Sequence, residues 1–190
     1  SYSVNRVVFP AFATIQDDME RFKNNYIRSF NLLTFLMFLG SLMLIITSRP
    51  FISLALTAKW LPAVPFMKLF FIDGFFLPLL IFNINTLYST GRGGTSLRID
   101  ILKKALLLIS ILVLFRYGIE ALIAGQVFST MVSMIFSAVA VGKIHNISYR
   151  LIFTPLLKLF IISGLSFALS LFIEAGAAGS DWIELLLKVT

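Results

Sequence analysis

The sequence predicts an all-α protein, a polytopic bundle of transmembrane helices. Of its 190 residues, 58% are hydrophobic and only 13% are charged, whereas charged residues make up about 25% of an ordinary soluble domain. The mean hydropathy is +0.94. The apolar runs are long and do not alternate with a period of two residues, so they favour membrane-spanning helices over the strands of a barrel.

Residues 1–29 are predicted to hold the end of a preceding helix and then a cytoplasmic amphipathic segment. The apolar start contains Pro10, which ends or kinks a helix because proline lacks a backbone N–H. In the charged stretch that follows, Met19, Phe22 and Tyr26 recur at spacings of three and four residues. This spacing places them on one helix face, which indicates either a helix at the membrane surface or a helix in a solvated loop.

Five transmembrane helices are expected in residues 30–173. In the first of them, no charged residue lies between Arg28 and Arg49. The length of this uncharged stretch is close to the roughly 20 residues that a spanning helix needs. Residues 174–190 are expected to form an outer loop and the truncated start of a further helix, so the sequence is predicted to be a piece of a longer chain. The expected spans are residues 30–47, 66–88, 101–115, 119–141 and 151–173.

The basic residues predict how these helices are oriented. With a cytoplasmic N-terminus, ten basic residues fall in inner loops and three in outer loops, which is the bias of the positive-inside rule. A net charge of +7 can indicate nucleic-acid binding in a soluble protein, but this distribution is typical of membrane loops, and no nucleic-acid partner is expected. The inner residues are Arg6, Arg21, Lys23, Arg28, Arg92, Arg98, Lys103, Lys104, Lys143 and Arg150, and the outer ones are Arg49, Lys59 and Arg116.

One face of the second expected helix is polar. At 100° per residue, and neglecting any kink at Pro78, an arc of about 140° contains Lys68, Asp73, Asn83 and Thr86. A charge in hydrocarbon costs several kilocalories per mole, so this face should point into the bundle or a hydrated cavity. It either lines a path for a polar or anionic substrate, or holds a snorkelling lysine beside interhelical hydrogen bonds.

Two more basic residues are candidates for the same cavity. Lys158 lies inside the cytoplasmic half of the fifth expected helix, and Arg92 lies in the turn before the third. A lysine that faces a cavity suits a diphosphate or an acidic sugar, and snorkelling to the inner interface is the alternative for Lys158. The candidate substrate-binding residues are therefore Lys68, Asp73, Asn83, Arg92 and Lys158.

The fourth expected helix carries a stripe of small polar residues, for which close helix packing is the favoured interpretation. Its members are Gln126, Ser129, Thr130, Ser133 and Ser137.

The sequence offers little for catalysis or metal binding. It has no cysteine and one histidine, His145, and a single histidine does not make a zinc site. Residues 91–94 are rich in glycine but lack the Lys-Ser/Thr of a phosphate-binding loop, so they indicate a flexible turn. We expect no metal, no cofactor, no catalytic residue and no enzymatic activity.

Three segments carry a resemblance to a known family. Residues 6–18 are similar to its FP-x-F/Y-x-x-x-Q-x-D segment, and residues 59–65 to its G-x-K-W-x-x-A-x-P loop, with Thr57 in place of the glycine. Asn83, followed by the Gly-Arg turn at 91–92, is similar to a third pattern. Together these segments resemble the polysaccharide flippases of the multidrug/oligosaccharidyl-lipid/polysaccharide exporter superfamily.

The resemblance implies a two-lobed protein of about fourteen helices, of which this chain would be the C-terminal half. It implies a transporter that flips undecaprenyl-diphosphate-linked oligosaccharide across the bacterial cytoplasmic (inner) membrane for surface polysaccharide or lipopolysaccharide biosynthesis. The implied partners are the lipid bilayer, the lipid-linked oligosaccharide and the missing N-terminal lobe of the same chain.

Two alternatives remain open. The first is a cation-coupled multidrug exporter of the same superfamily, which would use an intramembrane carboxylate such as Asp73. The second is a non-transport membrane enzyme or a structural subunit of polysaccharide assembly.

Overall fold

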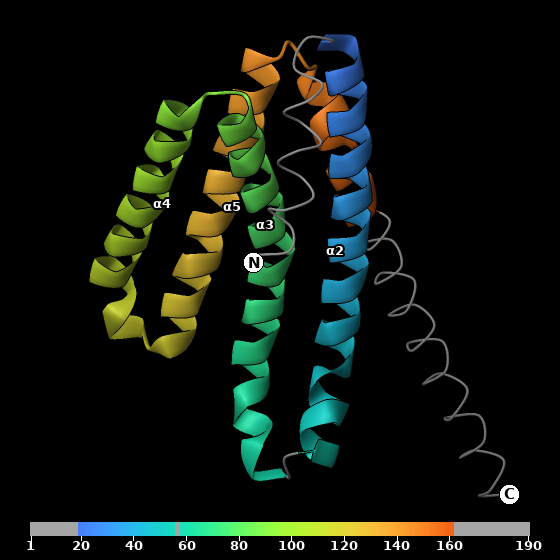
Figure 1. Cartoon of the computed structure of the whole chain (residues 1–190). Coiled ribbons are helices and arrows are strands. Elements are labelled where there is room, and N and C mark those ends of the chain that lie inside the picture. Colours follow the sequence, from blue (N-terminus) through green and yellow to red (C-terminus); the bar gives the residue numbers. More distant parts are fainter. Residues whose placement is uncertain (1–18, 56–57, 162–190) are drawn as a thin grey trace, which may run out of the picture. The chain divides into compact units, whose positions relative to one another are not determined.

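The structure, a computed structural model, describes residues 19–55 and 58–161 (Figure 1). Its elements are α2 (Met19–Ala55), the short 3-10 helix η1 (Ala58–Ala63), α3 (Val64–Ser89), α4 (Gly93–Leu114), η2 (Phe115–Tyr117) and α5 (Ile119–Ile144). Residues 149–161 are also helical, and the described residues form no strand. The predicted all-α fold is therefore confirmed.

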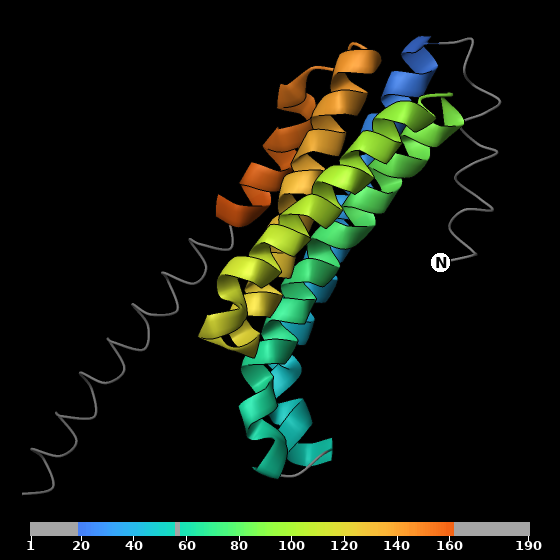
Figure 2. The same ribbon diagram turned by 90° about the vertical axis from the view of Figure 1, so that its left-hand side faces the viewer.

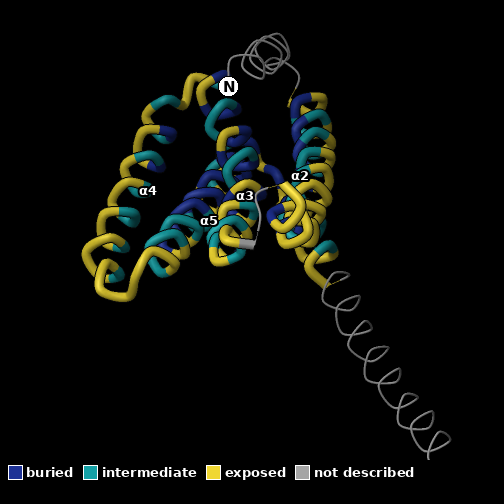
Figure 3. Tube along the Cα trace, turned by 90° about the horizontal axis from the view of Figure 1, so that it is seen from below, coloured by how far each residue is buried: buried dark blue, intermediate teal, exposed yellow. Residues whose placement is uncertain are grey.

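The chain divides into two compact units, Ser1–Ile152 and Phe153–Thr190, and α2 to α5 belong to the first. In that unit α3 packs against both α2 and α5, while α4 packs mainly on α5 (Figures 1 and 2). Buried positions gather where α2, α3 and α5 face one another (Figure 3). Only Ser96 and Ile99 of α4 are buried, so the core of the unit is formed by three helices.

Helix α2 presents one continuous face to this core. Phe22, Tyr26, Phe30 and Thr34 recur every four residues and are all buried, as expected for one face of an α-helix. The rings of Tyr26 and Phe30 lie 5.6 and 6.1 Å from the ring of Phe82 on α3. Such aromatic pairs each contribute roughly 0.5–1.5 kcal/mol beyond the burial of their area, so they fix α2 against α3.

The amphipathic segment expected before residue 30 is continuous with the first span. Residues 19–39 contain no proline or glycine, so nothing in this stretch ends the helix. The result is a single α2 of 37 residues, about 55 Å long at 1.5 Å per residue. Because the hydrocarbon core is only about 30 Å thick, α2 must tilt or extend beyond it.

Among the residues that the structure describes, three helical segments are long and apolar enough to cross a membrane: Met19–Ala55, Lys59–Ser89 and Ile119–Ile144. The expected spans 66–88 and 119–141 fall within the last two. Helix α4, which contains the expected span 101–115, does not qualify because its first half carries Arg98, Asp100, Lys103 and Lys104. The expected span 151–173 lies partly outside the described residues, and residues 1–18 and 174–190 lie entirely outside them.

Candidate functional site

The candidate residues predicted from the sequence do not gather in one cavity. Lys68 is exposed near the start of α3, Asp73 and Asn83 are buried along it, and Arg92 is exposed in the turn after it. At 1.5 Å per residue, Lys68 and Asn83 are about 22 Å apart along the helix axis. Lys158 is exposed and belongs to the second unit. The structure therefore spreads the α3 candidates along the whole helix.

A hydrogen-bonded seam of three side chains crosses the core, and we call it the polar seam. The Tyr26 hydroxyl donates to Asn83 Oδ1 at 2.7 Å, and Asn83 Nδ2 donates to Ser137 Oγ at 3.0 Å. Ser137 Oγ in turn donates to the carbonyl oxygen of Met134 at 2.7 Å. All three side chains of the seam have 0% exposure, so the seam joins α2, α3 and α5 through fully buried hydrogen bonds.

The serine stripe of α5 lies in the same core. Ser129, Thr130, Ser133 and Ser137 each have 0% exposure, so the prediction that the stripe packs between helices is confirmed for them, and Gln126 is half-buried. The hydroxyl of Ser133 donates to the carbonyl of Ser129 at 2.7 Å. Ser129 and Ser137 likewise donate to carbonyls of their own helix, whereas the Thr130 hydroxyl has no partner among the described residues. These short side chains leave room for α3 to approach closely.

Asp73 is the buried carboxylate of α3. It is 6% exposed, and its Oδ1 has no hydrogen-bond partner within residues 19–55 and 58–161. A buried polar atom without a partner costs about 1–3 kcal/mol, and more when charged. Burial of Asp73 is therefore unfavourable unless its carboxylate gains a partner, and residues 19–55 and 58–161 provide none for Oδ1.

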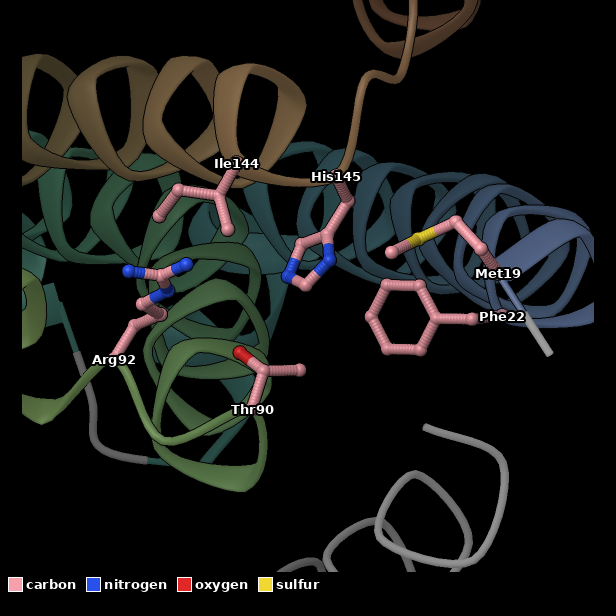
Figure 4. Close-up of a pocket in the computed structure, with 6 residues that line it drawn as sticks. All are labelled: Met19, Phe22, Thr90, Arg92, Ile144 and His145. Atoms are coloured by element: carbon pink, nitrogen blue, oxygen red, sulfur yellow. The ribbon is translucent and has the colours of Figure 1, made fainter. Parts of the chain in front are cut away.

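A recess lies at the end of the bundle where α3 and α5 end and α2 and α4 begin (Figure 4). It has a volume of about 180 Å³. Six residues line it: Met19, Phe22, Thr90, Arg92, Ile144 and His145. We call it the Arg92–His145 recess, and the orientation predicted from the sequence places it on the cytoplasmic side.

A Schellman turn after α3 places Arg92 at this recess. Gly91 has φ +72°, a conformation that favours glycine. The N–H of Gly91 donates to the Tyr88 carbonyl at 3.1 Å, and the N–H of Arg92 donates to the Leu87 carbonyl at 2.8 Å. This is the Schellman pair of bonds, so the glycine-rich segment 91–94 begins with a defined turn.

A related turn after α5 places His145. Asn146 has φ +52°, and asparagine is among the residues that tolerate this region best. The N–H of Ile147 donates to the Gly142 carbonyl at 2.8 Å, which is the longer Schellman bond. His145 is therefore the C-cap residue directly after α5, and its ring is directed into the recess (Figure 4).

The His145 ring is 6% exposed, and its Nε2 has no hydrogen-bond partner among the described residues. Its centroid lies 4.5 Å from that of the Phe22 ring. Burial, and then the positive charges of Arg92 and Lys23, lower the pKa of His145 below its usual value of 6.5. Both causes disfavour a second positive charge on the ring, so the imidazole is neutral at pH 7.

Sequence reasoning did not identify Tyr26, Ser137 or His145 as parts of a polar site. The spacing of Tyr26 predicts a helix face either at the membrane surface or in a solvated loop, and the stripe that contains Ser137 predicts helix packing. Their partner Asn83 could be named in advance because an amide in a long apolar run stands out, but the helix register that pairs the three is not visible in one sequence. For His145, the available signal was a lone histidine followed by Asn146 at a predicted helix end.

Comparisons with known proteins bear on the first third of the chain. Residues 1–65 match the family described as "Polysaccharide biosynthesis protein". A stretch of 71 residues, 37% of this chain, is 37% identical to an uncharacterized membrane protein in the cps region of Klebsiella pneumoniae and covers 15% of that protein. A stretch of the same length is 34% identical to the lipopolysaccharide biosynthesis protein WzxC of Escherichia coli K12 and covers 14% of it.

No solved structure shows a significant match to the chain. The matched stretches span only about a seventh of the two relatives. Over that stretch the resemblance predicted from the sequence is confirmed. The comparisons support a role in polysaccharide or lipopolysaccharide biosynthesis, and a location in the bacterial inner membrane as a multi-pass protein.

Proposed function

We propose that this multi-pass inner-membrane protein, which resembles polysaccharide biosynthesis proteins over residues 1–65, takes part in flipping lipid-linked oligosaccharide across the membrane. The protein acts as a transporter and not as an enzyme. The observation that carries the proposal is the match to a membrane protein in the cps region of Klebsiella pneumoniae and to the lipopolysaccharide biosynthesis protein WzxC. The substrate is an oligosaccharide joined through diphosphate to a polyprenyl lipid.

The helix arrangement is compatible with this role. A polar substrate that crosses a bilayer needs a route lined by polar groups, because hydrocarbon offers no hydrogen bonds. Lys68 of α3 is exposed on this chain and can face such a route, whereas Asp73, Asn83 and Thr86 of the same helix are buried inside the bundle. Lys68 and Lys158 are the cations that would attract the diphosphate or an acidic sugar, and the remaining wall would come from the N-terminal lobe.

One observation favours the cation-coupled exporter as a second candidate. The Oδ1 atom of Asp73 is buried and has no partner among the described residues. A carboxylate of this kind can bind a proton or a metal cation during a transport cycle. The two candidate functions therefore depend on different charges. Flipping of a lipid-linked oligosaccharide needs the lysines, and cation-coupled export needs Asp73.

Export by charge variants tests the proposal. The variants are made in the protein as its own gene encodes it, in cells that lack their own flippase, and surface polysaccharide is measured by gel and lectin blotting. Lys68→Gln and Lys158→Gln should each lower export at unchanged protein levels, whereas Lys→Arg at either position should retain more activity because the charge remains. Lys104→Gln is the matched control, because this side chain is 79% exposed at the surface of α4.

Two results would contradict the proposal. Normal export in both glutamine variants, combined with loss of export in Asp73→Asn, would favour the cation-coupled exporter. An equal loss in Lys104→Gln would show that the assay responds to any change of surface charge. Near-normal export in Lys158→Gln alone would assign that lysine to snorkelling at the inner interface.

A further inference from the structure

The Arg92–His145 recess combines a buried, unpartnered ring nitrogen with an exposed guanidinium. His145 Nε2 has no partner among the described residues although the ring is only 6% exposed. In Figure 4 the imidazole, the Arg92 side chain and the Thr90 hydroxyl lie around one space. The volume of about 180 Å³ exceeds what one water needs, so a group larger than water fits beside the ring.

Two positive charges, those of Arg92 and Lys23, act on the His145 ring in this recess. Neither of them forms an ion pair with a carboxylate of residues 19–55 and 58–161, whereas Lys104 pairs with Asp100 at 3.8 Å on the surface of α4. Both positive charges act on the His145 ring and hold its pKa down. The recess therefore has a positive potential that an anionic ligand would neutralise, whereas a cation would be repelled.

The helix ends do not reverse this sign. The C-termini of α3 and α5 bring partial negative charges of about half a unit each, and the N-terminus of α4 brings a partial positive charge of similar size. Some of the C-terminal carbonyls are already occupied by the two turns at Gly91 and Asn146. Against these fractions stand the two full charges of Arg92 and Lys23, which are the charges that act on the His145 ring.

The start of α4 adds donors for an anion. Helix α4 begins at Gly93, directly after Arg92, and has 22 residues. The first N–H groups of a helix have no carbonyl partner within the helix and bind phosphate readily. Glycine at 93 and 94 leaves the backbone open to close approach. Arg92, which lines the recess together with His145, therefore lies directly before these free N–H groups.

We infer that the Arg92–His145 recess binds the phosphate group of an anionic ligand at the predicted cytoplasmic end of the bundle. Arg92 supplies two parallel N–H donors, as guanidinium groups do for phosphate, and His145 Nε2 donates a third hydrogen bond in the tautomer that carries its proton there. Phe22 and Met19 form the apolar wall of the recess, which suits the start of a lipid chain. That the ligand is the diphosphate of a lipid-linked sugar rests on the proposed function.

The single histidine of the sequence makes the test direct. The 190-residue chain is labelled at histidine and placed in nanodiscs of phosphatidylcholine, and the imidazole signal is followed by NMR. One series adds inorganic phosphate or pyrophosphate to the solution. A second series incorporates phosphatidic acid or undecaprenyl diphosphate into the disc. We expect a saturable shift of the His145 signal with the phosphate-bearing lipids.

Variants of Arg92 decide whether the shift reports this recess. Arg92→Gln should raise the half-saturating concentration by about tenfold or more, the usual effect of losing a hydrogen bond to a charged group, and Arg92→Lys should raise it less. Arg116→Gln is the matched control, because Arg116 is exposed at the other end of α4. Circular dichroism verifies that each variant keeps its helix content.

The outcomes separate the ligand sources. A shift with free phosphate as well as lipid supports recognition of the phosphate group itself, and a shift with lipid alone supports a headgroup site. No shift in any series, or an unchanged titration in Arg92→Gln, would overturn the inference. If the export assay with the lysine variants contradicts the proposed function while the His145 titration stays normal, the recess still binds phosphate and only the proposed function fails. If export is normal while the titration is absent, only the recess is refuted.

Discussion

Replacing Asn83 with alanine tests the polar seam most directly. The change removes the amide that accepts from Tyr26 at 2.7 Å and donates to Ser137 at 3.0 Å. Ser137 keeps its own bond to the Met134 carbonyl, so its hydroxyl stays satisfied. The Tyr26 hydroxyl, at 0% exposure, loses its acceptor and remains buried. The cost of Asn83→Ala is therefore dominated by two interhelical hydrogen bonds and one orphaned donor.

The magnitude follows from these parts. An interhelical hydrogen bond in a membrane protein contributes about 0.6 kcal/mol on average and up to about 1.7. A buried donor left without a partner costs about 1–3 kcal/mol. We therefore expect Asn83→Ala to lower the free energy of unfolding by roughly 2–4 kcal/mol. Tyr26→Phe, which leaves the buried Asn83 Oδ1 without its donor, should lower it by roughly 1.5–3.5 kcal/mol. In the double variant, Tyr26→Phe should cost nothing further because it removes the orphaned hydroxyl.

Unfolding by sodium dodecyl sulfate in mixed micelles, followed by circular dichroism, measures these differences. Tyr88→Phe is the matched control for the loss of a phenolic hydroxyl, because Tyr88 lies on α3 and is 49% exposed. It should change the free energy of unfolding by less than about 0.5 kcal/mol. If Tyr26→Phe and Asn83→Ala are as neutral as this control, or if their effects simply add, the seam does not join the helices.

Three further predictions concern packing, pH and topology. Gly125→Ala should destabilise the chain by about 1–3 kcal/mol in the same unfolding assay, because the added Cβ would lie 2.7 Å from the Ser110 Cβ. Gly40→Ala is the control: its Cβ would meet no atom within 4 Å, and the change should be neutral or stabilising. Folding lowers the pKa of His145 from its ordinary value of 6.5, so the stability that its neutral ring contributes should be fully present above about pH 6.5 and lost as the pH falls below that value through the lower folded pKa. His145→Gln should flatten that part of the unfolding profile. A cysteine placed at Lys59 should react with an impermeant reagent added from outside, and one in the glycine-rich turn after α3 should not; the reverse pattern would contradict the orientation.

Much of the fold was predictable because the membrane leaves few choices. Long apolar runs without period-two alternation specify helices, and the short charged or glycine-containing gaps between them specify antiparallel neighbours. The start of α2 was less visible. The mixture of charge and aromatic residues in 19–29 indicated a separate surface helix, but the physical condition for a break, a proline or glycine, is missing there.

The site was predictable only one residue at a time. Burial of Asp73 and Asn83 follows from their polarity in an apolar run, and the structure places both inside the bundle. Which residues they contact depends on how neighbouring helices are rotated and shifted relative to one another. The periodicity of residues within one helix does not predict that arrangement. Asn83 therefore finds Tyr26 and Ser137, while Asp73, ten residues away on α3, finds no hydrogen-bond partner for Oδ1 among the described residues.

The polar seam and the Arg92–His145 recess share the first turns of α2. Phe22 packs on the His145 ring, and Tyr26, one turn further on, donates to Asn83. Both α2 residues lie in the stretch 1–65 that matches polysaccharide biosynthesis proteins, whereas Asn83 and His145 lie outside it. The part of the chain with a recognisable relationship thus forms one wall of each polar feature, and α3 and α5 form the others. A movement of α2 relative to α3 and α5 would break the seam and open the recess together, because the same two turns of helix hold both.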